Sequence, residues 1–375
     1  MESSPHTQAP SREPEAPSQE SAPRRRRRRF DAGAWAPVLF FVFLIVFFGV
    51  VEPEDFLNTG NLTSILNNNA TLAIIALGLT VVLLAGEFDL SVASAASLGG
   101  AVGAVMVANE GLSTEVTFAA VIGLGLLIGL VNGVLVTYFQ IPALIVTLAV
   151  ASILDGFTQL ITNNEIIFAG FSDTFVDLGG WKLGDVQAPV FYLAGIAILL
   201  GIALRYTATG RHLHAVGGNR GASRMAGIRV NRHIILAFVI SGTLAALAGM
   251  IYTARQGSLT PLFGTSFLLP AFAAAFLGSV TLRRGEFHVL GTVIGVYLIG
   301  TGTTGLLIVG GATYTQQLFA GAVLILATAG SRVLGRGVGL RRQLGFGRRR
   351  SGRGDGDASM PPGRSAEDGP PPGGA

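Results

Sequence analysis

Long apolar stretches alternate with short polar ones along most of this chain. A helix needs about 20 apolar residues to cross the hydrocarbon core of a bilayer. The stretches of suitable length lie near residues 35–51, 66–85, 91–108, 116–138, 142–161, 188–205, 234–253, 266–281, 288–309 and 312–330. Only residues 86–89 separate the second from the third, and the eighth is short and contains Pro270. The pattern predicts an all-α fold, a polytopic membrane helix bundle of about ten transmembrane helices.

The composition agrees with a membrane protein. Half of the residues are hydrophobic, 13% are charged and the mean hydropathy is +0.57, which is unusual for a soluble domain of this length. Gly125, Gly129 and Gly133 recur every four residues inside an apolar stretch, and Gly291 and Gly295 repeat that spacing. Small residues so spaced let transmembrane helices approach closely, so these glycines predict tight helix contacts.

The basic residues indicate which ends of the predicted helices face the cytoplasm. Of 26 lysines and arginines, seven lie before residue 35, six in residues 205–232, two at positions 283 and 284, and nine after residue 330. With ten spans these 24 residues share one side, and only Lys182 and Arg255 lie on the other. Because cytoplasmic loops carry an excess of Lys and Arg, we expect both termini to be cytoplasmic. Six or eight spans would break this agreement in the middle of the chain.

The two ends of the chain differ from the apolar region between them. Residues 1–34 are expected to be a disordered basic cytoplasmic tail, and residues 331–375 a disordered tail rich in Gly, Arg and Pro, because neither can bury enough apolar surface to fold alone. Residues 35–330 then form one transmembrane domain. An apolar stretch follows the arginines of residues 24–29, which we interpret as an anchor to anionic lipid and not as a nucleic-acid site.

The central basic loop, residues 205–232, is the longest loop on the predicted cytoplasmic side. It carries six arginines between two apolar stretches, together with small residues such as Gly218, Ala222 and Ala226. This composition is typical of more than a connector. We expect the loop to be a docking surface for a soluble partner.

The longest external loop, residues 162–187, is acidic. Glu165, Asp173, Asp177 and Asp185 stand against a single lysine. The loop is either a landing surface for an external protein or an ordinary acidic loop, and the sequence leaves both open. Short elements within it are expected to hold Phe175 and Trp181 at the level of the lipid headgroups.

The sequence contains no recognisable catalytic, cofactor or metal site. A Walker A loop needs a lysine to reach the terminal phosphates, and the one lysine, Lys182, lacks the glycine pattern before it. There is no cysteine, no His-Glu-x-x-His and no Gly-x-Ser-x-Gly. His212 and His214 lie among arginines, where a surface role is expected instead of metal binding. We expect a non-catalytic protein.

Polar residues at membrane depth are costly and draw attention as functional candidates. The candidates for contact with a solute are Asn67, Asn68, Glu87, Asp89 and Asp155. The carboxylate of Asp155 can accept hydrogen bonds from paired hydroxyls of a solute, or it makes a helix-packing hydrogen bond. For Glu87 and Asp89 the alternative is a capped turn, because Asp89 followed by Ser91 suits a helix N-terminus.

Several motifs together resemble those of a known family. They are LAGEFDLSV at residues 84–92, IPALIVTL at 141–148, GRHLHAVGGN at 210–219 and ASRMAGI at 222–228. In order and spacing they resemble the permease subunits of bacterial carbohydrate ABC importers, of the ribose, xylose and galactose type, over residues 35–330. The last third departs from the family pattern at residues 269–274 and 283–285, which puts the identity of the substrate in doubt.

The resemblance implies a non-catalytic permease subunit of an ATP-driven importer in the bacterial plasma membrane. Two copies, as a homodimer, would form the translocation path for a sugar or sugar-like solute delivered by an external binding protein. An ATP-binding cassette subunit on a separate chain would dock against a short amphipathic helix in the central basic loop. The residues implied in this coupling are Gly218, Asn219, Ala222, Ser223, Ala226 and Gly227.

Three alternatives stay open on the sequence. Related permeases of the same superfamily carry nucleosides or branched-chain amino acids. An ATPase-independent secondary transporter would be supported by buried carboxylates such as Asp155, although no internal duplication is clear. A scaffold or receptor without transport would leave the polar residues at membrane depth unexplained.

Overall fold

The computed structural model describes residues 35–281 and 285–329, which are mostly helical. Within them, eight helices are long and apolar enough to cross a membrane, and the two shorter apolar helices Ala36–Val51 and Tyr314–Ala329 match the first and last predicted spans. The all-α membrane bundle predicted from the hydrophobic pattern is therefore confirmed. The predicted tails, with Arg283 and Arg284, lie outside the described residues.

The elements follow one another in a simple order. The first half comprises α1 (Ala36–Val51), α2 (Pro53–Phe56), α3 (Thr59–Leu84), α4 (Val92–Ala104), the π-helix η2 (Val105–Asn109), α5 (Thr114–Thr137), α6 (Ala143–Thr162) and α7 (Asp173–Gly180). A hairpin of β1 (Lys182–Leu183) and β2 (Val186–Gln187) follows, and then α8 (Ala188–Tyr206), α9 (Ala208–Gly218), α10 (Arg220–Met225), α11 (Val230–Gln256), the 3₁₀-helix η3 (Phe263–Phe267), α12 (Leu268–Val280) and α13 (Val289–Ile308).

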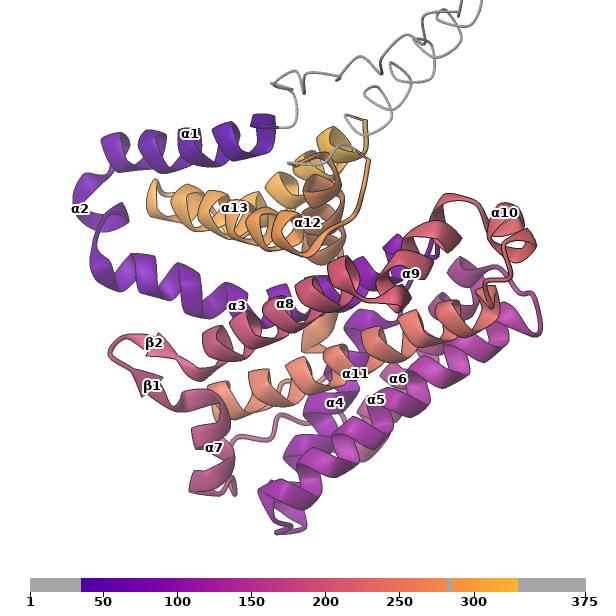
Figure 1. The fold of residues 1–375 in the computed structure, drawn as a ribbon. Helices are drawn as coiled ribbons and strands as arrows, with labels where there is room; N and C mark the ends of the chain where they lie inside the picture. Colours follow the sequence, from indigo (N-terminus) through magenta and orange to yellow (C-terminus); the bar gives the residue numbers. More distant parts are fainter. Residues whose placement is uncertain (1–34, 282–284, 330–375) are drawn as a thin grey trace, which may run out of the picture.

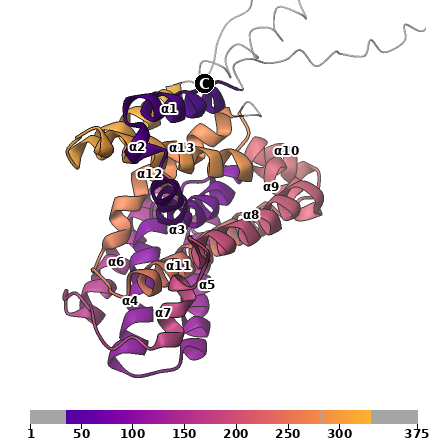
Figure 2. The ribbon, with the colours of Figure 1, turned by 90° about the vertical axis from the view of Figure 1, so that its left-hand side faces the viewer.

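The helix α3 is the centre of the bundle, and 83% of an 18-residue apolar stretch within it is buried. On one side α3 packs against α11, which also contacts α4 and α5; on the other side it packs against α12 and α13. Figures 1 and 2 show these as two groups of helices on opposite sides of α3. By contrast, only 28% of the corresponding stretch of α6 and 22% of that of α8 are buried. Their apolar outer faces are left for lipid or for another membrane protein.

The predicted glycine contacts are confirmed. A Cβ atom at Gly129 would overlap the backbone of Phe238 in α11, and one at Gly125 or Gly133 would press on the same helix. Gly291 and Gly295 pack in the same way against Gly278 and Ala274 of α12. These glycines therefore let α5 meet α11, and α13 meet α12, at backbone distance.

The described loops gather at two opposite ends of the bundle. At one end, Gly86 in the α3–α4 loop contacts Gly217 of α9. At the other end, Ile167 pairs with Leu259 in an isolated antiparallel bridge. The first end therefore holds loops predicted to be cytoplasmic, and the second holds loops predicted to be external. We call them the cytoplasmic and the external end below, as the sequence predicts them to be.

The helices α3 and α11 begin before their predicted starts. The helix α3 begins at Thr59, seven residues before the predicted start, because its first turns are polar and reduce the hydropathy without breaking the helix.

Pro270 lies in the first turn of α12, where its missing N–H has no helical partner to lose. The helix therefore tolerates a proline that looked disruptive in the sequence.

The expectation for Phe175 is wrong. Its side chain is fully buried and packs with Val107, Val121 and Met250 inside the protein, so it cannot lie among lipid headgroups. The reason is that α7 packs against α11. Trp181 is 53% exposed, as an interfacial residue would be.

Candidate functional site

The central basic loop folds into two short helices, α9 and α10, each begun by a side-chain cap. The hydroxyl of Thr207 accepts a hydrogen bond from Gly210 N, and the amide oxygen of Asn219 accepts one from Ala222 N at 2.9 Å. Such caps satisfy the free N–H groups of a first helical turn. Gly227 then ends the segment with φ +80°, a conformation that favours glycine. We call residues 207–227 the coupling segment.

The coupling segment presents most of its predicted contact residues on the surface. Gly218, Asn219, Ala222, Ala226 and Gly227 are exposed. Ser223 differs, because it is buried and therefore lies beneath this surface. Met225 was not among the predicted coupling residues, yet it is 92% exposed. Its flexible apolar side chain beside two alanines gives α10 a small, adaptable apolar surface.

An ion pair fastens the coupling segment to the α3–α4 loop. Arg220 Nη2 lies 2.6 Å from Glu87 Oε1 and donates to the carbonyl oxygen of Gly86 at 3.0 Å. Next to this pair, Gly217 lies directly on the carbonyl oxygen of Leu84, where any side chain would collide with the backbone. The segment is thus held at the end of α3 by both charge and close packing.

The environment of Glu87 shows why Arg220 matters. Glu87 lies in the loop between two spans and is buried. Burial raises the pKa of the Glu87 carboxyl, and the nearby charge and hydrogen bond of Arg220 partly offset this rise. Loss of Arg220 would leave a buried carboxylate without its compensating charge.

A second contact joins the coupling segment to α11. His212 Nδ1 of α9 lies 3.2 Å from His233 Nε2 of α11, and His233 Nδ1 lies 2.9 Å from the carbonyl oxygen of Arg229. Because a carbonyl only accepts, His233 Nδ1 is the donor in the second of these contacts. In the neutral imidazole of His233, Nε2 is then the acceptor for His212 Nδ1. His212 therefore packs against α11 and is only partly on the surface.

Asp89 is the centre of a buried hydrogen-bond network. Its Oδ1 accepts from Ser91 N at 3.0 Å and from Ser91 Oγ at 2.6 Å, and its Oδ2 accepts from Ser241 Oγ at 2.8 Å. Asn132 Nδ2 in α5 donates in turn to Ser91 Oγ. The network ties the start of α4 to α5 and α11. Its geometry favours the capped-turn interpretation of Asp89.

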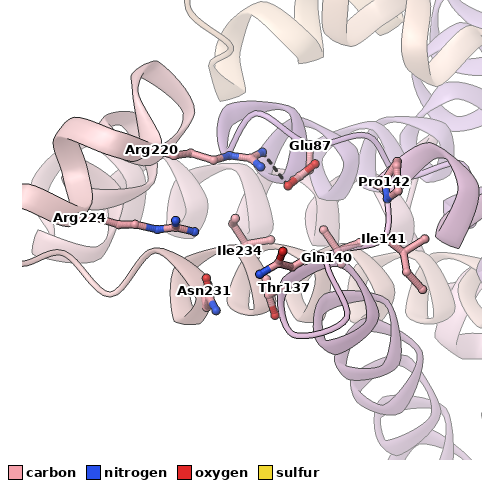
Figure 3. Close-up of a pocket in the computed structure, with 11 residues that line it drawn as sticks. Glu87, Thr137, Gln140, Ile141, Pro142, Arg220, Arg224, Asn231 and Ile234 are labelled. Carbon is pink, nitrogen blue, oxygen red and sulfur yellow. Dashed lines mark ion pairs between the residues drawn. The ribbon is translucent and has the colours of Figure 1, made fainter. Parts of the chain in front are cut away.

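A cavity of about 300 Å³ lies between the coupling segment and the body of the protein. Its walls come from the α3–α4 loop, the end of α5, the start of α6, α10 and the start of α11 (Figure 3). The lining residues are Glu87, Val136, Thr137, Gln140, Ile141, Pro142, Ala143, Arg220, Arg224, Asn231 and Ile234. The cavity is therefore mostly polar and sits at the cytoplasmic end of the bundle.

Asn67 and Asn68 lie at the opposite, external end. Asn67 donates to the carbonyl oxygen of Asp185 and accepts from Gln187 N, each at 2.9 Å, which fastens the β-hairpin to α3. Asn68 accepts a hydrogen bond from the guanidinium of Arg255, which also donates to Gln187. Both asparagines therefore already have protein partners at this end.

Asp155 lies in α6, apart from the other candidates. Its Oδ1 is buried, and no residue in the described ranges hydrogen-bonds to it. The helix-packing hydrogen bond that the sequence left open for Asp155 is therefore not made by this oxygen within the described ranges. The structure thus spreads the five candidates over two ends and α6 and does not gather them in one site.

Comparisons with known proteins agree with this architecture. The family described as "Branched-chain amino acid transport system / permease component" matches residues 61–328. The ribose import permease of Escherichia coli K12 is 36% identical over 309 residues, which are 80% of this chain and 95% of that protein. The D-allose permease of the same organism is 34% identical, over 79% of this chain and 91% of that protein. The L-arabinose permease of Azospirillum brasilense is 30% identical, over 85% and 94%. No solved structure matches the chain.

Proposed function

The chain belongs to the family of branched-chain amino acid transport system permease components, and we propose that it is the membrane-spanning subunit of an ATP-driven sugar importer. The observation that carries the proposal is the coupling segment, a pair of capped helices held against α3 with an exposed apolar surface. A transporter without a cytoplasmic partner has no evident need for such a surface.

The solute is a sugar or sugar-like molecule. Three similar permeases are named for ribose, D-allose and L-arabinose, and each is matched over at least 90% of its own length. These solutes are small and rich in hydroxyl groups. Asp155, whose buried Oδ1 has no partner within the part of the chain that the structure describes, is suited to accept hydrogen bonds from hydroxyls in the solute path.

The energy comes from ATP hydrolysed by a separate ATP-binding cassette subunit. The chain itself has no Walker A lysine. We place the docking surface on Asn219, Ala222, Met225 and Ala226, which are exposed around α10. Closure of the ATPase on ATP can shift the permease between two states only if its contacts differ between them. Because the coupling segment is held firmly against the end of α3, it can transmit such a difference from the ATPase to the spanning helices.

A second copy of the chain and an external binding protein complete the proposed importer in the bacterial plasma membrane. The outer faces of α6 and α8 are apolar and mostly unburied, which suits a homodimer contact or lipid. At the external end, the acidic residues of the α6–α8 loop and the fastened β-hairpin form a surface that the binding protein can meet.

Uptake measurements in a strain that lacks this chain test the solute class. Radiolabelled D-ribose, D-allose, L-arabinose, a nucleoside and leucine are supplied one at a time, with and without the plasmid-borne gene. We expect the gene to restore uptake of at least one sugar and of neither other compound. Restored uptake of only the nucleoside or leucine would favour the corresponding branch of the family instead.

A further inference from the structure

The cavity at the cytoplasmic end is lined by two arginines and only one carboxylate. Arg220 is neutralised by Glu87, but Arg224 also extends from α10 into the same space, toward Ile234 and Gln140 (Figure 3). Arg224 forms no ion pair with any residue of the described ranges 35–281 and 285–329. With Glu87 ionised, the cavity has one positive charge in excess.

Neutral hydrogen-bonding groups lie opposite Arg224. The amides of Gln140 and Asn231 line the cavity from the α5–α6 loop and from the start of α11. Neither side chain hydrogen-bonds within the described part of the protein, so both are available as donors. Gln140 also has a left-handed backbone, with φ +57°, which is uncommon for a residue with a side chain. Such conformations are often kept where a site requires them.

The cavity lies where the membrane surface is expected. Tyr138 and Phe139, next to the lining residues Thr137 and Gln140, are each 67% exposed at the end of the spanning helix α5. Exposed aromatic rings at the end of a span are typical of the membrane–water interface. The cavity therefore lies at the level where lipid headgroups are expected.

We infer that this cavity is a binding site for a phosphate group, held by Arg224 with the amides of Gln140 and Asn231. A guanidinium binds phosphate through charge-assisted hydrogen bonds, and basic pockets between transmembrane helices on the cytoplasmic side suit anionic headgroups. A volume of about 300 Å³ is at the lower end for small-molecule sites and admits a phosphate with a small organic group. The phosphate belongs to an anionic lipid or to a soluble phosphate ester.

The site has a consequence for the coupling segment. Arg220 already ties α10 to the α3–α4 loop. A phosphate between Arg224 and the amides of Gln140 and Asn231 would add a second tie, from α10 to α11 and to the α5–α6 loop. Binding would stabilise one position of the coupling segment. The inference does not depend on which solute the protein carries.

The test uses the full chain purified in neutral detergent. Melting temperature is measured while a probe is titrated: dioleoyl phosphatidylglycerol against dioleoyl phosphatidylcholine in one series, and glycerol 3-phosphate against glycerol at equal ionic strength in the other. The variant is Arg224→Gln. Its matched control is Arg229→Gln, which removes the same charge from an exposed position nearby that does not line the cavity. The basic tails are the same in every variant, so the difference between the two isolates the cavity.

We expect wild type and Arg229→Gln to be stabilised by the phosphate-bearing probe of at least one series. Arg224→Gln should bind that probe about tenfold more weakly or worse, as loss of a charge-assisted contact implies. Gln140→Ala should weaken it in the same direction. A response to phosphatidylglycerol alone assigns the site to lipid, and a response to glycerol 3-phosphate assigns it to a soluble ester. Equal responses of Arg224→Gln and Arg229→Gln, or no response in either series, would overturn the inference.

Discussion

Among single residues, Arg220 joins two parts of the chain that are far apart in sequence. Its partner Glu87 lies in the loop after α3, is buried, and has a raised pKa that Arg220 partly offsets. Burying a carboxylate without a partner costs free energy, whereas replacing both partners by neutral groups is tolerated much better. The pair should therefore behave as a unit in mutagenesis.

Arg220→Gln is expected to reduce the free energy of unfolding by about 1–3 kcal/mol, because it leaves Glu87 buried and uncompensated. The double variant Glu87→Gln/Arg220→Gln should regain most of that loss, and Arg229→Gln should stay within about 0.5 kcal/mol of wild type. Melting temperatures of the purified variants give the comparison. If the single and double variants are equally destabilised, the pair has no coupling energy and the fastening is due to packing alone.

Asp155 tests the proposed solute path. Asp155→Asn is expected to lower the initial rate of sugar uptake at least several-fold with little change in melting temperature, because the amide keeps the size but loses the charge and one acceptor. Asp155→Leu should abolish uptake. Both quantities are measured for both variants in the same membranes. Normal uptake by Asp155→Asn together with a lowered melting temperature would assign the residue to packing.

Residues far apart in sequence show where sequence reasoning stopped. Glu87 and Asp89 are two residues apart, and the same two roles, solute contact or a capped turn, were predicted for both. In the structure Glu87 forms an ion pair with Arg220, whereas Asp89 accepts hydrogen bonds from Ser91 and Ser241. The two side chains of this loop therefore point to different neighbours. Nothing in the sequence pairs Glu87 with a residue more than a hundred positions later. The exposure of Met225 is likewise a property of how α10 packs.

At the scale of helices, the seam between α5 and α11 depends on glycine. Gly129→Ala should lower the melting temperature strongly and reduce the yield of folded protein, because its Cβ overlaps the backbone of α11 and not a movable side chain. Gly123→Ala in the same helix is the matched control, since nothing lies within 4 Å of its Cβ position. The control should be neutral or slightly stabilising, because alanine favours a helix. Equal effects of the two changes would argue against the close contact.

Helix boundaries were predictable only where hydropathy changes with them. The sequence located α5, α6 and α13 within about two residues because apolar stretches start and stop with these helices. It missed the polar first turns of α3 and α11, where Asn61 and Arg232 are helical without being apolar. The burial of Phe175 could not be foreseen either, since it follows from α7 folding against α11.

For the molecule as a whole, the sidedness predicted from charge can be measured directly, because the chain has no cysteine. Met225→Cys should react with an impermeant maleimide only from the cytoplasmic side, and Leu183→Cys only from outside; both positions are well exposed. Ser223 is less suitable than its neighbour, since it is buried. Labelling of position 225 from outside would reverse the orientation and remove the coupling segment from any cytoplasmic ATPase.

The central claim is that a cytoplasmic ATPase drives transport through the exposed surface of α10. The direct test is the initial rate of sugar uptake into proteoliposomes that contain the chain and its co-purified ATP-binding subunit, with the binding protein present, and with or without ATP on the side of that subunit. Wild type and the control Thr209→Arg should transport only with ATP. Ala226→Arg, which places bulk and charge on the docking surface, should transport at least about tenfold more slowly while inserting normally. Uptake at the same rate without ATP would contradict the account and identify an ATPase-independent transporter.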